Sequence, residues 1–168
     1  MSRSHEARGD ASALYTPEQR ERRDKSKWTV VQGVLAPLQF LVFLVSLALV
    51  ARYLLTGLGY EAATLSILIK TGVLYLIMVT GAIWEKVVFG QYLLAPAFFW
   101  EDVVSFFVIA LHTLYVVVLL TDFLPTTSQM MIALAAYLRY VINAGQFLLK
   151  LRAARLEAAA NPQQAVAA

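Results

Sequence analysis

Four long apolar stretches, separated by short polar connections, dominate the pattern of the chain. The first stretch, from Trp28 to Ala51, contains no Asp, Glu, Lys or Arg. At a rise of about 1.5 Å per residue, a helix of this length can cross a hydrocarbon layer of about 30 Å. The other three contain at most one such residue each, and we place the spans at about residues 28–51, 62–84, 103–120 and 129–149. The pattern predicts an all-α integral membrane protein with four transmembrane helices.

Glycine and proline, the strongest local markers of turns, lie between these stretches. Gly57 and Gly59 follow the first span, Pro96 lies between the second and third, and Pro125 precedes the fourth. We expect a transmembrane domain over residues 28–152, an N-terminal tail over 1–27, and a C-terminal tail over 153–168 whose end is disordered.

Composition supports this interpretation. Hydrophobic residues make up 60% of the 168 residues, and the mean hydropathy is +0.64, whereas soluble domains contain roughly 45–50% apolar residues. A soluble bundle could not cover such helices with so few polar side chains. The mixed-charge tail before Trp28 leads into an apolar run too long for a signal peptide, so we expect no cleavable signal.

Lysine and arginine gather near the two ends of the chain. Seven precede Trp28, and Lys150, Arg152 and Arg155 follow the last span. By the positive-inside rule, both termini and the connection between spans two and three are cytoplasmic. The net charge of +3 comes largely from these ends, so it indicates membrane orientation and not nucleic-acid binding.

The chain lacks cysteine, which excludes iron–sulfur clusters, Cys-ligated zinc, disulfides and a thiol nucleophile. Of its two histidines, only His112 lies within the spans. A two-haem or di-metal bundle needs more ligands. The residues therefore offer no site for these metal centres.

Lys70, His112 and Arg139 lie near the middles of spans two, three and four. Ionisable groups at this depth are costly and are candidates for function. Helical spacing places Glu101, Ser105 and His112 on one face of span three. Span four carries a similar stripe of Arg139, Asn143, Gln146 and Lys150. We expect both stripes to face inward.

These buried polar groups have two interpretations. The amides of Gln32, Gln39, Asn143 and Gln146 favour interhelical hydrogen bonds. Lys70 and Arg139 have no carboxylate inside the same spans, so they can bind either another helix or an anionic ligand. His112 can form an interhelical hydrogen bond, ligate a metal or carry a proton.

Carboxyl and aromatic side chains gather around the second connection: Trp84, Glu85, Tyr92, Phe98, Phe99, Trp100, Glu101 and Asp102. A carboxyl among aromatic rings at a membrane interface can keep a proton near neutral pH. Alternatively, Glu85 pairs with Lys86 at the surface, Glu101 and Asp102 form a negative helix N-terminus, and the rings form an interfacial belt.

Four segments carry a resemblance to a known family: LYTPEQRERRD (14–24), WTVVQGVLAPLQFLVFLVSL (28–47), TGAIWEKVVFGQYLLAPAFFWEDVVS (80–105) and YVINAGQFLLKLR (140–152). They closely resemble the 3-vinyl bacteriochlorophyllide hydratases of bacteriochlorophyll synthesis. The resemblance covers roughly Leu14 to Leu156.

The resemblance implies a hydro-lyase of the photosynthetic pigment pathway in a bacterial inner, or intracytoplasmic, membrane. Water adds, without a cofactor, across the C3-vinyl group of a magnesium-bearing chlorophyllide or bacteriochlorophyllide and gives a 1-hydroxyethyl group. Neighbouring pigment-biosynthesis enzymes are implied as partners. The chemistry needs an acid, a base and a dry site for a large planar ring.

The roles of individual residues are our own inference. Glu85 is the expected acid, and Glu101 or Asp102 the group that orients or deprotonates water. The remaining candidates contact the pigment: His112 its magnesium, Lys70, Arg139 or Lys86 its propionate, and Trp84, Tyr92 and Trp100 its ring.

Two other classes stay open. A non-catalytic pigment carrier or assembly factor would need the aromatic side chains and His112 but not the carboxyls. A small transporter would also carry charges at the midplane, but the chain shows no clear internal repeat.

Overall fold

The computed structural model describes residues 14–160. The disorder predicted for the last residues of the chain concerns positions outside this range. Between them, the described residues form four long helices: α3 (Lys27–Thr56), α4 (Tyr60–Phe89), α5 (Phe99–Thr121) and α6 (Thr126–Ala160). All four are long and apolar enough to cross a membrane, α6 over Thr126–Ala153. The predicted all-helical, multi-pass architecture is confirmed.

All four helices extend beyond the predicted spans, and the first two end at glycines. Gly57 and Gly90 cap α3 and α4 with left-handed backbone angles, φ 71° and 88°, a conformation that glycine adopts without steric cost. Gly59 precedes α4 in the same conformation. The breaks expected at Gly57 and Gly59 are therefore present.

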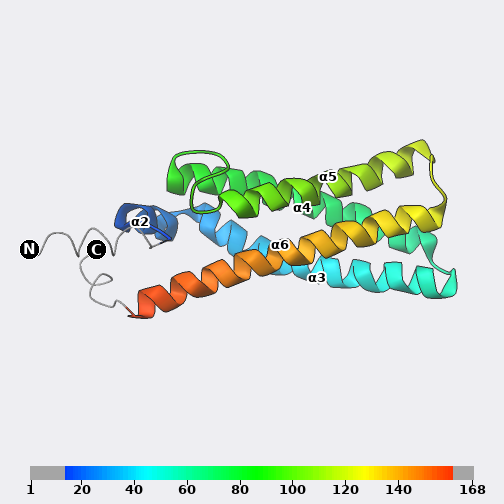
Figure 1. The fold of residues 1–168 in the computed structure, drawn as a ribbon, viewed down its shortest axis with the longest axis horizontal. Coiled ribbons are helices and arrows are strands. Elements are labelled where there is room, and N and C mark those ends of the chain that lie inside the picture. The colour runs from blue at the N-terminus through cyan, green and yellow to red at the C-terminus, as the bar shows by residue number, and fades with distance from the viewer. Residues whose placement is uncertain (1–13, 161–168) are drawn as a thin grey trace, which may run out of the picture.

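One helix was not predicted: α2 (Pro17–Lys25), in the tail that precedes the first span. Thr16 Oγ1 accepts a hydrogen bond from the Gln19 N–H, and Gln19 Oε1 accepts one from the Thr16 N–H. This reciprocal capping box, with Pro17 at the first helical position, is a start signal legible in the sequence. Helix α2 lies at the end of the bundle that also carries the α4–α5 connection (Figure 1), here called the α2 end.

The bundle consists of two helical hairpins. Helix α3 packs along α4, and α5 packs along α6, whereas α3 with α6 and α4 with α5 have far fewer residues in contact. Figure 1 shows the hairpins side by side along the long axis. Because few residues are in contact between the hairpins, a side chain that bridges them contributes strongly to their association.

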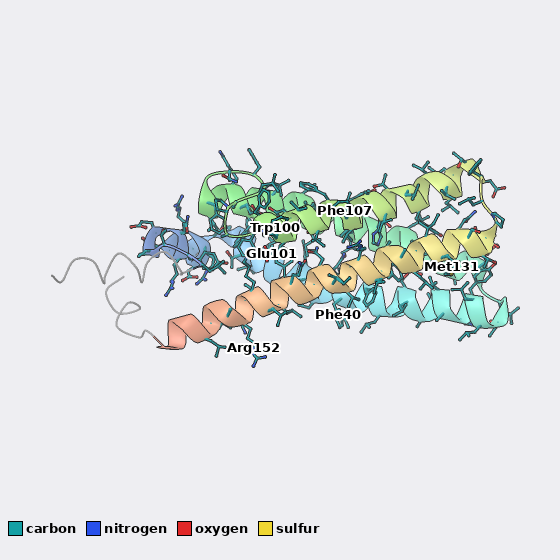
Figure 2. All side chains as sticks on the ribbon, in the orientation of Figure 1. Phe40, Trp100, Glu101, Phe107, Met131 and Arg152 are labelled. Carbon is teal, nitrogen blue, oxygen red and sulfur yellow. The ribbon has the colours of Figure 1, made fainter. Side chains whose placement is uncertain are left out.

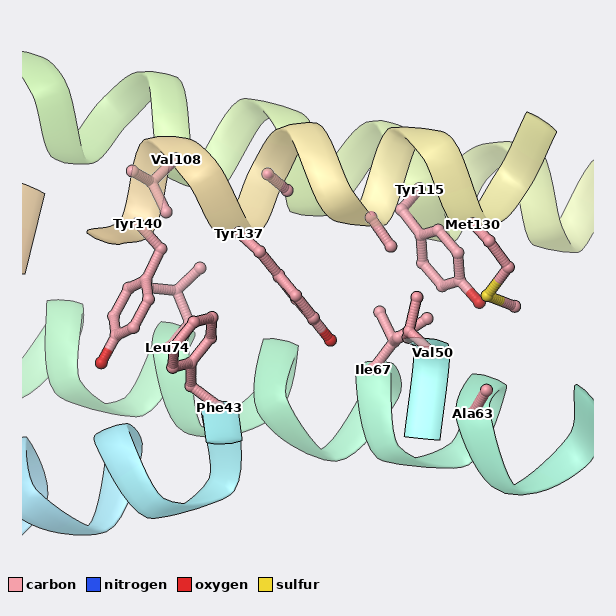
Figure 3. Close-up of a cluster of buried hydrophobic side chains, with 12 residues drawn as sticks. Phe43, Val50, Ala63, Ile67, Leu74, Val108, Tyr115, Met130, Tyr137 and Tyr140 are labelled. Atoms are coloured by element: carbon pink, nitrogen blue, oxygen red, sulfur yellow. The ribbon is translucent and has the colours of Figure 1, made fainter. Parts of the chain in front are cut away.

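The buried apolar side chains form two separate clusters. The central cluster includes Phe43, Ile67, Tyr115, Tyr137 and Tyr140 (Figure 3). The end cluster, at the α2 end, consists of Tyr15, Val88 and Phe98, with Leu14, Trp84, Phe89, Ala97 and Phe147 packed against it. The stretch of bundle between the two clusters is polar.

Large apolar side chains also cover the outside of the bundle, as expected of a surface that faces lipid. Val45, Leu65, Phe107 and Leu138, one from each long helix, are about three-fifths exposed. Phe40, Phe107 and Met131 project from the bundle in Figure 2. Apolar residues inside and outside are typical of a membrane protein.

The polar stripes face inward only in part. Glu101, Ser105 and His112 are buried on α5, as predicted. On α6, Asn143 is buried and Gln146 and Lys150 are half-buried, but Arg139 is exposed. The prediction that Arg139 faces inward is wrong, because the next residue, Tyr140, occupies the core face and successive helical side chains point about 100° apart.

Candidate active site

Three carboxyl groups meet at the α2 end, where α4 ends and α5 begins. The residues Glu85, Glu101 and Asp102 are 5%, 7% and 3% exposed. Burial of charged groups is unfavourable unless each is paired or hydrogen-bonded. The contacts of each carboxyl therefore reveal how the cluster is stabilised.

The α4–α5 connection binds two of these carboxyls through consecutive backbone N–H groups. Leu94 N donates to Asp102 Oδ2 over 2.7 Å, and Ala95 N donates to Glu85 Oε2 over 3.2 Å. Leu94 has a left-handed backbone with φ 59°, which is uncommon for a residue other than glycine. Because Leu94 and Ala95 are consecutive, this turn holds the carboxyls of Glu85 and Asp102 next to each other.

A pair of carboxyls in this arrangement is suited to holding a single proton. An ionised carboxylate can only accept hydrogen bonds, so a hydrogen bond between two carboxyls needs a proton on one of them. Two ionised carboxylates held side by side would repel each other. Glu85 and Asp102 together thus form a candidate proton donor.

Glu101 has a different partner. Lys150 Nζ, from α6, lies 2.7 Å from Glu101 Oε2 and 5.1 Å from the centre of the Phe98 ring. The ammonium group stabilises the ionised form of the carboxylate. Glu101 is therefore a candidate proton acceptor next to the candidate donor.

The end cluster supports this site from the side of the tail. Phe98 stacks on Phe147 and meets Trp84 edge-on, each at 5.7 Å between ring centres. The indole N–H of Trp84 donates to Thr29 Oγ1 over 2.9 Å. Trp84, predicted to contact the pigment ring, thus already packs inside the end cluster.

Tyr15, just before α2, joins the same cluster and was not among the predicted site residues, because it stands in the tail outside the four apolar spans. Its ring is 5% exposed and stacks on Phe89 at 5.8 Å. Burial raises the pKa of the Tyr15 hydroxyl, whereas the guanidinium of Arg23, 4.7 Å from the ring centre, lowers it. Tyr15 attaches α2 to the bundle beside the carboxyls.

Around the connection, other side chains remain open to ligands. Tyr92 and Trp100 are 60% and 69% exposed, and Figure 2 shows Trp100 beside Glu101. Lys86 Nζ donates to the Gly90 carbonyl over 2.7 Å and lies 5.3 Å from the centre of the Tyr92 ring. A cation and two aromatic rings thus adjoin the carboxyl cluster.

Lys70 and His112 form a second polar site, in the middle of the bundle. His112 Nδ1 lies 2.8 Å from the Val108 carbonyl, and Nε2 lies 3.1 Å from Lys70 Nζ. Since a carbonyl only accepts, Nδ1 carries the hydrogen and Nε2 accepts from Lys70. The ammonium group also lies 4.0 Å from the centre of the Tyr140 ring, a cation–π contact.

This geometry bears on two predicted roles, Lys70 as a contact for the pigment propionate and His112 as a ligand of the pigment magnesium. Lys70 and His112 are both fully buried, and both ring nitrogens of His112 are already bonded. Magnesium binding at Nε2 would require Lys70 to move away. Arg139, on the exposed face of α6, is not brought together with them.

Comparison with known proteins identifies the family. A family profile described as 2-vinyl bacteriochlorophyllide hydratase matches residues 15–153. The chain belongs to this hydratase family. The matched range begins at Tyr15 and contains all three carboxyls and Lys150.

Two hydratases of this family illustrate the similarity. The 2-vinyl bacteriochlorophyllide hydratase of Rhodobacter capsulatus is 73% identical over 147 residues, which is 88% of this chain and 85% of the relative. That of Cereibacter sphaeroides is 73% identical over 144 residues, 86% of this chain and 89% of the relative. No solved structure matches the chain.

Proposed function

We propose that the chain adds water to the C3-vinyl group of a chlorophyllide or bacteriochlorophyllide, the vinyl group numbered 2 in the family name, and that the carboxyl cluster performs the reaction. The observation that carries this assignment is the contrast between neighbouring acids. Glu85 and Asp102 bind consecutive N–H groups of one turn, while Glu101 pairs with Lys150. A proton donor and a proton acceptor thus lie side by side.

The reaction begins when the Glu85–Asp102 pair gives its proton to the terminal vinyl carbon. The carbon attached to the macrocycle becomes cationic, and the conjugated ring delocalises the charge. The oxygen of a water molecule bonds to this carbon while Glu101 accepts a proton from the water. The net change is the addition of H and OH across the double bond, and transfer of the proton from Glu101 back to the pair restores the site.

The pigment binds against the exposed aromatic side chains of the α4–α5 connection. Tyr92 and Trp100 offer faces for a planar ring, and Lys86 is the cation best placed for the propionate because it lies beside Tyr92. Lys70 is less suited to this role, since His112 and aromatic rings already surround it. The contact between His112 and magnesium remains a prediction that depends on displacement of Lys70.

The enzyme functions in a bacterial inner membrane, and both of its termini lie in the cytoplasm. The excess of lysine and arginine near the two ends supports this orientation. The carboxyl cluster then lies at the cytoplasmic surface, where neighbouring enzymes of pigment synthesis can exchange a membrane-bound substrate.

The test uses membranes from a host that does not synthesise the pigment but expresses this protein. A 3-vinyl bacteriochlorophyllide is added to these membranes. The expected product is heavier by one water. Glu85→Gln should bind pigment normally but hydrate it at least about a hundredfold more slowly, because general acid–base steps contribute about 10²–10⁴-fold.

Glu61→Gln is the matched control, since Glu61 is an exposed acid in the first turn of the same helix, at its opposite end. It should hydrate like the parent. Pigment binding without any hydrated product from the parent would instead identify a carrier. Normal turnover by Glu85→Gln would move the acid to another carboxyl.

A further inference from the structure

The polar stretch between the two apolar clusters contains amide groups without partners. Among the described residues, neither amide atom of Gln39 has a hydrogen-bond partner, and Asn143 Oδ1 and Gln146 Oε1 also lack one. Gln39 is 2% exposed and Asn143 9%. Leaving buried polar atoms unpaired is destabilising, so each needs an explanation. We call Gln39, Asn143 and Gln146 the amide layer.

The three amides lie at neighbouring levels of the bundle. Phe43 on α3 and Tyr140 on α6 meet at 5.0 Å between ring centres, side by side in Figure 3. Gln39 is one turn before Phe43, and Asn143 is about one turn after Tyr140. Because α3 and α6 run in opposite directions, both steps lead toward the α2 end, and Gln146 lies one turn further along.

A chain of hydrogen bonds links this layer to the backbone of Glu101, a member of the carboxyl cluster. Asn143 Nδ2 donates to Ser105 Oγ over 2.7 Å, and Ser105 Oγ donates to the Glu101 carbonyl over 2.8 Å. Since the serine hydrogen is used, Ser105 can only accept from Asn143. This fixes the orientation of the Asn143 amide, with Oδ1 as its free atom.

The unpaired atoms determine which chemical group can bind to the amide layer. They comprise three acceptor oxygens and one donor nitrogen, so the occupant must donate hydrogen bonds. Carbonyl and ester groups on a pigment can only accept, whereas water donates two hydrogen bonds and accepts two. Buried water commonly satisfies such otherwise unpaired groups.

We propose that the amide layer binds the water that the hydratase consumes and holds it ready beside Glu101. This inference rests on the proposed function. It explains how a reaction at the edge of the membrane obtains its second substrate while the site around the vinyl group stays dry. The amides bind water in the resting enzyme, before any pigment arrives.

The first test is radiolytic footprinting of the purified, pigment-free protein, in which X-rays turn bound water into radicals that oxidise adjacent side chains. Tyr140 and Phe147 flank the layer on α6. They should be oxidised in the parent and at least about fivefold less in Gln39→Met, which removes both unpaired atoms of one amide. Gln146→Met, at a half-buried position, is the second variant.

Turnover and stability give the second test. Gln39→Met should keep its pigment affinity and its melting temperature but hydrate at least about tenfold more slowly, because the water is no longer positioned. Gln129→Met is the matched control: Gln129 is also buried, but at the opposite end and paired with Tyr60 and Leu124. It should melt at a lower temperature and hydrate normally per folded molecule.

Three results would overturn the inference. Unchanged oxidation and turnover in Gln39→Met would show that the amides do not hold the reacting water. A lower melting temperature with no oxidation in the parent would identify an interhelical hydrogen bond. Weaker pigment binding at unchanged turnover would identify a pigment contact. If the parent fails to hydrate but oxidation still depends on Gln39, the water site stands and the proposed function fails.

Discussion

Glu101 and Asp102 are adjacent in sequence, yet they have opposite environments. Asp102 accepts a hydrogen bond from the backbone turn that also binds Glu85, whereas Glu101 meets an ammonium group from α6. Adjacent side chains on a helix point about 100° apart, so the two acids face different neighbours. In the proposed mechanism, this difference lets Asp102 take part in giving a proton and Glu101 in accepting one.

Substitution of Lys150 tests whether Glu101 is the proton acceptor. Lys150→Met leaves Glu101 buried without its cation, an unfavourable state for a carboxylate. We expect turnover to fall at least about tenfold with little change in pigment affinity, because the proton acceptor is affected and not the pigment contacts. Lys150→Arg should restore most of the rate. The measurements are kcat and KM for both variants.

Arg152→Met serves as the control, since Arg152 is an exposed cation on the same helix and should not change either constant. Normal turnover by Lys150→Met would exclude Glu101 as the proton acceptor. A rise in KM alone would instead make Lys150 a pigment contact.

The candidate site was predictable only where its members are close in the chain. Glu85, Glu101 and Asp102 stand near one connection, and their acidity among aromatic residues indicated a site. The pairing of Glu101 with Lys150 joins residues 49 apart, so it depends on how α5 packs against α6. The contacts from Leu94 and Ala95 are made by backbone atoms, which carry no mark in the sequence.

At the scale of the helices, hydrophobic runs predicted all four spans because crossing a membrane demands length and low charge. Two features escaped this pattern. Helix α2 is polar on all sides and is marked only by its capping box. The outward direction of Arg139 was misjudged because the spacing of polar residues alone did not account for the aromatic side chains that occupy the core face of α6.

The contact between Lys70 and His112 joins the two hairpins and can be tested by a double-mutant cycle. His112→Leu leaves the buried ammonium without its acceptor, so we expect a destabilisation of about 3 kcal/mol or more. Lys70→Met should cost less, because an apolar side chain of similar size replaces the charge. The double variant should recover much of the stability lost in His112→Leu.

Thermal unfolding in detergent measures this cycle, and the absorption spectrum of bound pigment provides a second observable. Additive losses would show that the two side chains do not stabilise each other. A changed spectrum in His112→Leu, at normal stability, would favour a magnesium ligand.

At the scale of the whole molecule, α3 begins and α6 ends at the same end of the bundle, so both tails leave the membrane on one side (Figure 1). By the positive-inside rule, the charge distribution predicts that this side faces the cytoplasm. Reporter fusions at Gly59 and Phe123 should therefore report the periplasm, and a fusion at Gln91 the cytoplasm. A periplasmic Gln91 would put the carboxyl cluster on the other side.

The turn at Leu94 has a consequence for how the enzyme can be observed. Its left-handed backbone points the N–H groups of two successive residues at Asp102 and Glu85, and loss of a proton from either acid strengthens the hydrogen bond that it accepts. The amide resonances of Leu94 and Ala95 are thus a built-in indicator of where the proton resides. Labelling these two nitrogens would let magnetic resonance follow the reaction from the protein, independently of the colour of its substrate.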